Sequence, residues 1–156
     1  IAFFLVLAID FGGTQVKSAL VSEDLVLEKS LPTQSSPQTL DKALDVIDHL
    51  VTSVEVALSG SAISVPETVD MEGGCDLSRR FVEILSWFSC QINLQAKYHF
   101  PVAALNDGKA AALAELATGH LKGVTNGAAL VLGSGLGGGK SVSYTHLRAH
   151  ETSAHL

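Results

Sequence analysis

A carboxylate, two glycines and a hydroxyl follow one another near the start of the chain, in the run Asp10-Phe11-Gly12-Gly13-Thr14. The run comes after an apolar stretch, residues 3–9, that is typical of a buried strand. At a strand end, Asp10 can hold a hydrated divalent cation, the glycines let backbone N–H groups approach phosphate oxygens, and Thr14 adds a hydroxyl. The turn is therefore a candidate phosphate-and-metal site, which Lys17 can support electrostatically. A tight hairpin turn with a solvated lysine is the alternative interpretation.

A second candidate group is the pair Asn106-Asp107, which lies between an apolar run, residues 101–105, and an alanine-rich segment, residues 108–118. The first pattern predicts a strand and the second a helix that Gly119 closes. In open α/β sheets, ligands bind beyond the carboxyl ends of the strands, and a side chain at such a junction has a fixed direction. The alternative is that Asp107 only caps the helix.

A third group is the glycine-rich run at residues 133–139, which follows an apolar segment, residues 128–132, and matches G-x-G-x-x-G. A dinucleotide-binding fold would follow this motif with a helix and an acidic residue about 20 positions later. The sequence after the run has neither feature. We expect instead a glycine-rich loop whose N–H groups cradle a phosphate.

The elements that must position these groups are predicted from hydrophobic periodicity. Short strands joined by a polar turn open the chain and predict an antiparallel meander, at residues 3–9, 17–22 and 25–29. Residues 32–38 read as a loop, and residues 40–51 carry apolar side chains at helical spacing. Later apolar runs predict strands that are covered on both faces, at residues 54–65, 101–105 and 128–132. Residues 71–98 have no clear period, and we expect a helix near residues 81–87. The fold class is α/β with a sheet of mixed direction, in which parallel strands with helices follow the antiparallel start.

Composition limits the classes of function. The 156 residues are 47% hydrophobic, which is enough for one domain with a substantial core, and the net charge of −6 with scattered basic residues disfavours nucleic-acid binding. Cys75 and Cys90 have neither the spacing nor the histidine neighbours of a zinc site or a disulfide framework. The opening apolar run is too short for a membrane span and lacks the basic flank of a signal peptide. We therefore expect a cytoplasmic protein that does not associate with membranes.

Taken together, these three groups resemble the ROK family of sugar kinases and repressors, within the superfamily of actin-like and hexokinase-like ATPases. The matching text is LAIDFGGTQVKSALV, PVAALNDGKAAALAELATGHLKG and GAALVLGSGLGGG, and ISVPETVD is similar to the family's sugar-side segment. The resemblance covers residues 5–139 and implies an actin-like, ribonuclease H-like ATPase domain.

The resemblance also implies roles for individual residues. Asp107 would be the catalytic base, Asn106 would hold a neighbouring sugar hydroxyl, and Asp10 would bind Mg²⁺ through water. Backbone groups would hold the ATP phosphates at Gly12, Gly13, Thr14, Gly133, Ser134, Gly135, Gly137 and Gly138. The implied function is transfer of the γ-phosphate of ATP to a hydroxyl of a hexose or N-acetylhexosamine by a homodimeric, glucokinase-like parent. The sugar-sensing domain of a ROK repressor is the alternative.

Two parts of the sequence depart from the family pattern. Pro66-Glu67 stands where the family usually has Pro-Gly. Residues 141–156 match no family element and resemble the translation of a sequencing-library adapter. We therefore expect residues 1–140 to be the N-terminal ATPase domain of a truncated kinase and residues 141–156 to be a non-native tail, of which residues 142–156 are disordered or packed arbitrarily. Such a fragment would lack the family's zinc-binding cysteine cluster and would be inactive.

Overall fold

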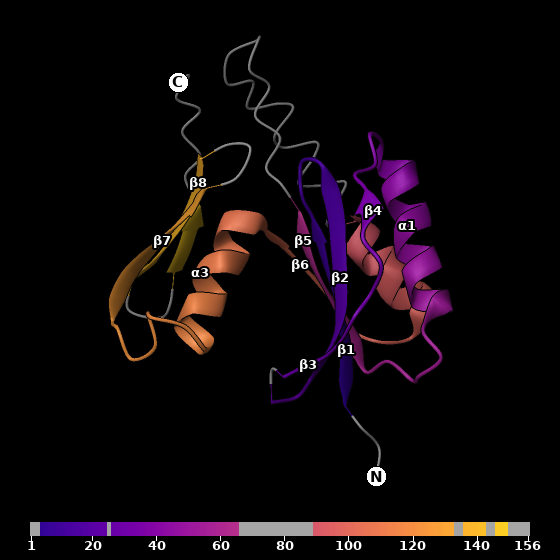
Figure 1. Ribbon diagram of the computed structural model, residues 1–156, viewed down its shortest axis with the longest axis horizontal. Helices are drawn as coiled ribbons and strands as arrows, with labels where there is room; N and C mark the ends of the chain where they lie inside the picture. Colours follow the sequence, from indigo (N-terminus) through magenta and orange to yellow (C-terminus); the bar gives the residue numbers. More distant parts are fainter. Residues whose placement is uncertain (1–3, 25, 66–88, 133–135, 143–145, 150–156) are drawn as a thin grey trace. The chain divides into compact units, whose positions relative to one another are not determined.

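The computed structural model describes residues 4–24, 26–65, 89–132, 136–142 and 146–149, the last two ranges by their backbone (Figure 1). The chain divides into two compact units. The first unit comprises Ile1–Ser64 with Phe81–Ala104, and the second comprises Val65–Arg80 with Leu105–Leu156.

The first unit opens with the expected antiparallel meander. Its strands are β1 (Leu5–Phe11), β2 (Gln15–Ser22) and β3 (Leu27–Ser30). β1 pairs with β2 along its whole length, from Leu5 opposite Ser22 to Phe11 opposite Val16. A short strand, β4 (Gln34–Ser35), also pairs with β2, in the segment that the sequence predicted to be a loop. Two polar residues carry no hydrophobic pattern, which is why β4 escaped prediction.

The sheet then continues on the other side of β1. β5 (Gly60–Val65) pairs with β1 in parallel, and β6 (Val102–Asn106) extends the sheet to the order β3-β2-β1-β5-β6. The mixed α/β sheet is therefore confirmed. The strand predicted from residue 54 begins only at Gly60, after an irregular stretch.

Two helices of the first unit lie on the same side of this sheet (Figure 1). The predicted helix is confirmed as α1 (Leu40–Ser53), and its N-terminus is capped by the Thr39 hydroxyl, which accepts a hydrogen bond from the Lys42 N–H. The second helix includes residues 89–98, which the sequence left unassigned, whereas the helix predicted at residues 81–87 lies outside the described residues. The signal for the second helix was the four-residue spacing of Cys90, Leu94 and Tyr98. The buried apolar side chains of this unit come from the sheet and both helices, and include Leu7, Ile9, Phe11, Val16, Leu20, Ala43, Ile47, Leu50, Ile63, Cys90 and Leu94.

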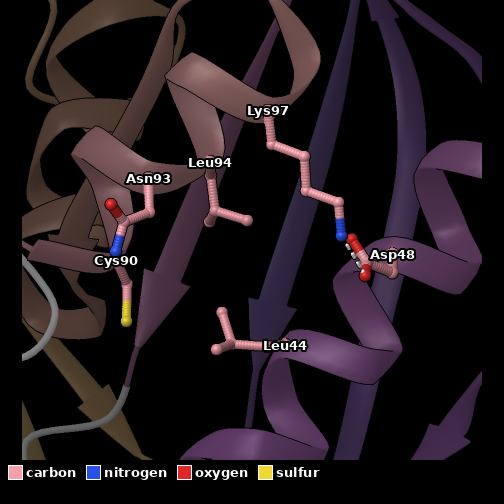
Figure 2. Close-up of a pocket in the computed structure, with 6 residues that line it drawn as sticks. All are labelled: Leu44, Asp48, Cys90, Asn93, Leu94 and Lys97. Atoms are coloured by element: carbon pink, nitrogen blue, oxygen red, sulfur yellow. Dashed lines mark hydrogen bonds and ion pairs between the residues drawn. The ribbon is translucent and has the colours of Figure 1, made fainter.

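The two helices also meet at the surface, where an open hollow of about 140 Å³ lies between them (Figure 2). Lys97 forms an ion pair with Asp48 across the hollow, and both side chains are partly exposed, so we expect this pair to contribute less than about 1 kcal/mol. Burial raises the pKa of the Cys90 thiol, and the nearby Asp41 carboxylate raises it further. Cys90 therefore behaves as a neutral, apolar side chain of the core.

The second unit contains a helix and an antiparallel sheet. The helix is α3 (Asp107–Ala117), as expected, and it contacts strands β7 (Asn126–Leu132), β8 (Leu136–Val142) and β9 (His146–Ala149), in the sheet order β7-β8-β9. The prediction that β7 is a parallel strand covered on both faces is wrong: it pairs antiparallel with β8, and Leu130 and Leu132 are 76% and 84% exposed. A short apolar run does not reveal the direction or the burial of its strand.

The segment after residue 139 also differs from expectation. β9 pairs with β8 from His146 opposite Val142 to Ala149 opposite Gly139, although the sequence predicted that this segment is disordered or packed arbitrarily. Backbone hydrogen bonds need no hydrophobic periodicity, which explains the error. The expected domain boundary at residue 140 lies inside β8. That residues 141–156 are foreign to the protein stays a prediction.

In the part of the chain that the structure describes, no helix combines the length and the apolar character needed to cross a membrane.

We predict that His99→Gly stabilises the chain. His99 follows the second helix with φ of 59°, in the left-handed region, and its N–H donates to the Gln95 carbonyl at 3.0 Å. Glycine adopts this conformation without the steric cost of a Cβ, so the free energy of unfolding should rise by roughly 1 kcal/mol. Urea denaturation measures the change.

The matched control is Ala96→Gly in the same helix, which should lower the free energy of unfolding by about 1 kcal/mol because glycine is a poor helix former. A loss of stability in His99→Gly as well would show that the left-handed backbone at this position carries no strain.

Candidate functional site

Asp10 lies on strand β1 and not in the turn after it, where the sequence placed it. The strand continues through Phe11, so Asp10 pairs in register with Lys17 of β2 and Ser64 of β5. Its neighbours along the strand, Ile9 and Phe11, are buried, whereas Asp10 and Lys17 are exposed. Side chains opposite each other on antiparallel strands lie about 5 Å apart at Cβ, so an acidic and a basic group share the open face at the strand end.

The turn between β1 and β2 consists of Gly12, Gly13 and Thr14. The Gly12 N–H donates to the Gln15 carbonyl at 2.9 Å, so it is used inside the turn. A Cβ on Gly12 would lie 2.9 Å from that same oxygen, which explains why glycine is required here. Within the described residues, no partner is recorded for the N–H groups of Gly13 and Thr14. These two groups are the donors that the turn can offer to an anion.

The turn is held from outside by Ser36, which the sequence analysis did not single out. The Ser36 hydroxyl donates to the Gly12 carbonyl at 2.7 Å, and its backbone N–H donates to the Thr14 carbonyl at 3.1 Å. β4 brings Ser36 to this place, because Ser35 pairs with Gln15. No local pattern reveals a contact between residues so far apart in the chain.

In the second unit, Asn106 caps helix α3. Its backbone is extended, and its side-chain oxygen accepts a hydrogen bond from the Lys109 N–H at 3.1 Å. The alternative interpretation, in which Asp107 is the cap, is wrong because Asp107 is the first helical residue. Asparagine and aspartate cap equally well, so residue type alone could not decide between them.

Asp107 is a half-buried carboxylate with a fixed direction. Its Oδ1 accepts hydrogen bonds from the Gly108 N–H at 2.6 Å and from the Asn106 Nδ2 at 3.1 Å. No hydrogen bond to Oδ2 is recorded among the residues that the structure describes. One oxygen therefore orients the group, and the other can accept a proton from a bound hydroxyl.

The glycine-rich run is only partly a loop. Gly137 and Gly138 lie in strand β8, opposite Val131 and Leu130, so the expectation of a loop through residue 139 is wrong. Glycines leave no side-chain pattern from which an antiparallel strand can be predicted. Gly133, Ser134 and Gly135 lie outside the described residues, as does Pro66-Glu67.

The residues of the candidate site therefore form two local groups. Asp10, the turn and Ser36 belong to the first unit, whereas Asn106 and Asp107 belong to the second. Among the described residues, no three of the His, Cys, Asp and Glu side chains gather to hold a metal.

We predict that Asn106→Ala lowers the free energy of unfolding by about 1 kcal/mol, because the Lys109 N–H loses its acceptor. Asn106→Ser keeps a capping oxygen, so its free energy of unfolding should be close to that of the wild type. Both variants lose the hydrogen bond to Asp107, so the difference between their urea denaturation curves isolates the cap. Equal losses in the two variants would contradict the capping role.

Comparison with known proteins places the chain in a family. A model of the ROK family matches residues 6–148. The glucokinase of Streptomyces coelicolor is 28% identical over 153 residues, which cover 94% of this chain and 46% of that protein. The N-acetylmannosamine kinase of Shigella flexneri is 30% identical over 137 residues, which cover 86% of this chain and 46% of that protein.

Among solved structures, a ROK family protein of Streptococcus pneumoniae in complex with sucrose superposes with a TM-score of 0.66 at 29% identity, and the match covers 94% of this chain and 48% of that one. The chain thus spans about half the length of the relatives that it matches. Because the family model matches residues 6–148, most of the chain, the chain belongs to the ROK family.

Proposed function

We propose that this chain is the N-terminal part of an ATP-dependent sugar kinase, which transfers the γ-phosphate of ATP to a hydroxyl of a hexose or N-acetylhexosamine. The observation that carries the proposal is the Asp107 carboxylate, with one oxygen fixed by two hydrogen bonds and, among the described residues, no bond recorded to the other. A glucokinase and an N-acetylmannosamine kinase among the relatives support the substrate class.

On this proposal, Asp107 is the general base. The attacking sugar hydroxyl donates a hydrogen bond to Oδ2 and gives up its proton to that oxygen as the sugar oxygen bonds to the γ-phosphorus; the bond from this phosphorus to the β–γ bridging oxygen breaks, and ADP leaves. The Asn106 amide holds the base in place, because one of its two N–H donors is bonded to Asp107 Oδ1. The second N–H donor is left to bind a neighbouring sugar hydroxyl.

The phosphates of ATP bind, on this proposal, at the turn after β1. Gly13 and Thr14 supply the N–H donors, and Gly12 gives the turn its shape without donating to the phosphate. The exposed Asp10 carboxylate suits a Mg²⁺ ion that keeps most of its water ligands, and bound Mg²⁺ would neutralise charge on the phosphates. The roles of Gly133, Ser134, Gly135, Gly137 and Gly138 in phosphate binding stay part of the proposal.

The sugar-sensing domain of a repressor is the other function to test. A sensor needs to bind the sugar but needs no base, so the open oxygen of Asp107 favours catalysis. A homodimeric parent, a cytoplasmic location and the lack of nucleic-acid binding through this segment complete the proposal.

We predict that Asp107→Asn in the longer parent protein lowers kcat by roughly 100-fold or more and leaves the sugar dissociation constant within about threefold. Asparagine keeps an oxygen for the Gly108 N–H and loses only the basic group. Steady-state kinetics and calorimetric titration with the sugar measure the two effects.

The matched control is Asp41→Asn, which removes an exposed carboxylate from the first turn of α1 in the same way. It should leave kcat unchanged. Near-normal turnover in Asp107→Asn would show that this residue is structural, and a parent that binds sugar without turnover would favour the sensor.

We predict that the 156-residue chain alone produces no ADP in response to sugar, because phosphoryl transfer needs both walls of a closing cleft to exclude water. A coupled assay with hexoses and acetylated amino-hexoses measures ADP, with the longer parent as the positive control. Turnover by the chain alone would overturn the proposal that it is an incomplete kinase.

A further inference from the structure

Ser36 makes two hydrogen bonds to opposite ends of the turn after β1. Its hydroxyl bonds the Gly12 carbonyl at 2.7 Å, and its N–H bonds the Thr14 carbonyl at 3.1 Å. The hydroxyl bond is shorter than the backbone bond and is partly buried. One residue from a distant strand end thus fixes the direction of two carbonyl groups.

The bond to Gly12 matters most, because it is the hydrogen bond that orients the peptide group between Gly12 and Gly13. In a planar trans peptide, the C=O and N–H bonds point in opposite directions. When the Gly12 carbonyl points to Ser36, the N–H of Gly13 points away from Ser36. That N–H is one of the two donors without a recorded partner in the described part of the chain.

A peptide between two glycines is also the easiest peptide in the turn to rotate. Neither Gly12 nor Gly13 has a Cβ that would limit φ and ψ, so the isolated turn has several peptide orientations available. Only some of them present the Gly13 N–H to a ligand. A hydrogen bond from outside the turn selects one orientation before the ligand arrives, which lowers the entropy cost of binding.

We propose that Ser36 is a positioning residue for phosphate: its hydroxyl holds the Gly12–Gly13 peptide so that the Gly13 N–H is presented to a phosphate oxygen. This inference rests on the proposed phosphate-binding role of the turn. It assigns to Ser36 no contact with the phosphate itself.

The test uses the 156-residue chain labelled with ¹⁵N and titrated with inorganic triphosphate in the presence of Mg²⁺. The amide resonances of Gly13 and Thr14 report binding at the turn. We expect a saturable shift of both resonances in the wild type, and a dissociation constant at least about fivefold higher in Ser36→Ala, which corresponds to the loss of one ordinary hydrogen bond.

Two further variants separate the positioning role from a general disturbance of β4. Ser36→Thr keeps the hydroxyl, so its dissociation constant for triphosphate should lie within about twofold of the wild-type value. Ser35→Ala makes the same change one residue earlier, at an exposed side chain on β4 for which no hydrogen bond is recorded among the described residues, and should also bind as the wild type does.

The outcomes are distinguishable. Wild-type affinity in Ser36→Ala overturns the role of Ser36 and leaves the phosphate site standing. Equal weakening in Ser36→Ala and Ser35→Ala, or no recovery in Ser36→Thr, also overturns it, because the effect would then belong to β4 as a whole. If the wild type shows no saturable shift at Gly13 or Thr14, the phosphate site of the proposed function fails, and the role of Ser36 fails with it.

Discussion

The alternation of side chains along β1 is the constraint on which the rest of the first unit depends. Leu7, Ile9 and Phe11 are 0%, 2% and 4% exposed, whereas Asp10 between them is exposed on the opposite face. β1 is paired on both sides, in antiparallel with β2 and in parallel with β5. A register shift of one residue would move the apolar side chains to the surface and Asp10 into the core, and both changes cost free energy. Hydrophobic burial therefore determines the position of the candidate metal-binding carboxylate.

The same pairing determines the length and shape of the turn that is the candidate phosphate site. Because Phe11 and Val16 are the last residues of β1 and β2 to pair, the chain must reverse direction within a few residues. In this short turn the Gln15 carbonyl oxygen lies so near Gly12 that a Cβ there would be 2.9 Å from it. Glycine is therefore required by this close approach and not by a left-handed backbone. Among the described glycines, positive φ is found at Gly123. The turn thus uses one N–H to close itself and leaves the next two for a ligand.

The sequence could predict the features that depend on side-chain patterns or on local order. Apolar runs and a polar turn identified the meander, helical spacing identified α1, and an alanine-rich run identified α3. The change from an apolar run to the alanine-rich run located the junction at Asn106 and Asp107. The missed strands rest on backbone pairing between distant residues. β4 and β9 carry no hydrophobic pattern, and the glycines of β8 have no side chains to show one. The contact from Ser36 to Gly12 joins residues that only the folded sheet brings together.

The two parts of the candidate site differ in whether they can be identified from the types of their residues. At the junction before α3, the candidate groups are side chains: Asn106 caps the helix and donates to Asp107, and Asp107 supplies a carboxylate, so their residue types identify them directly. At the turn after β1, the backbone N–H groups of Gly13 and Thr14 are the candidate donors to a phosphate, and their direction depends on hydrogen bonds made by other residues.

Any residue other than proline supplies an N–H, so the residue type of Gly13 or Thr14 does not identify it as a donor. What marks such a site is the set of residues that restrain it, here Gly12 through its lack of a Cβ and Ser36 through its hydroxyl. For a site built from the backbone, the informative residues are therefore the ones that hold the peptide groups and not the ones that donate.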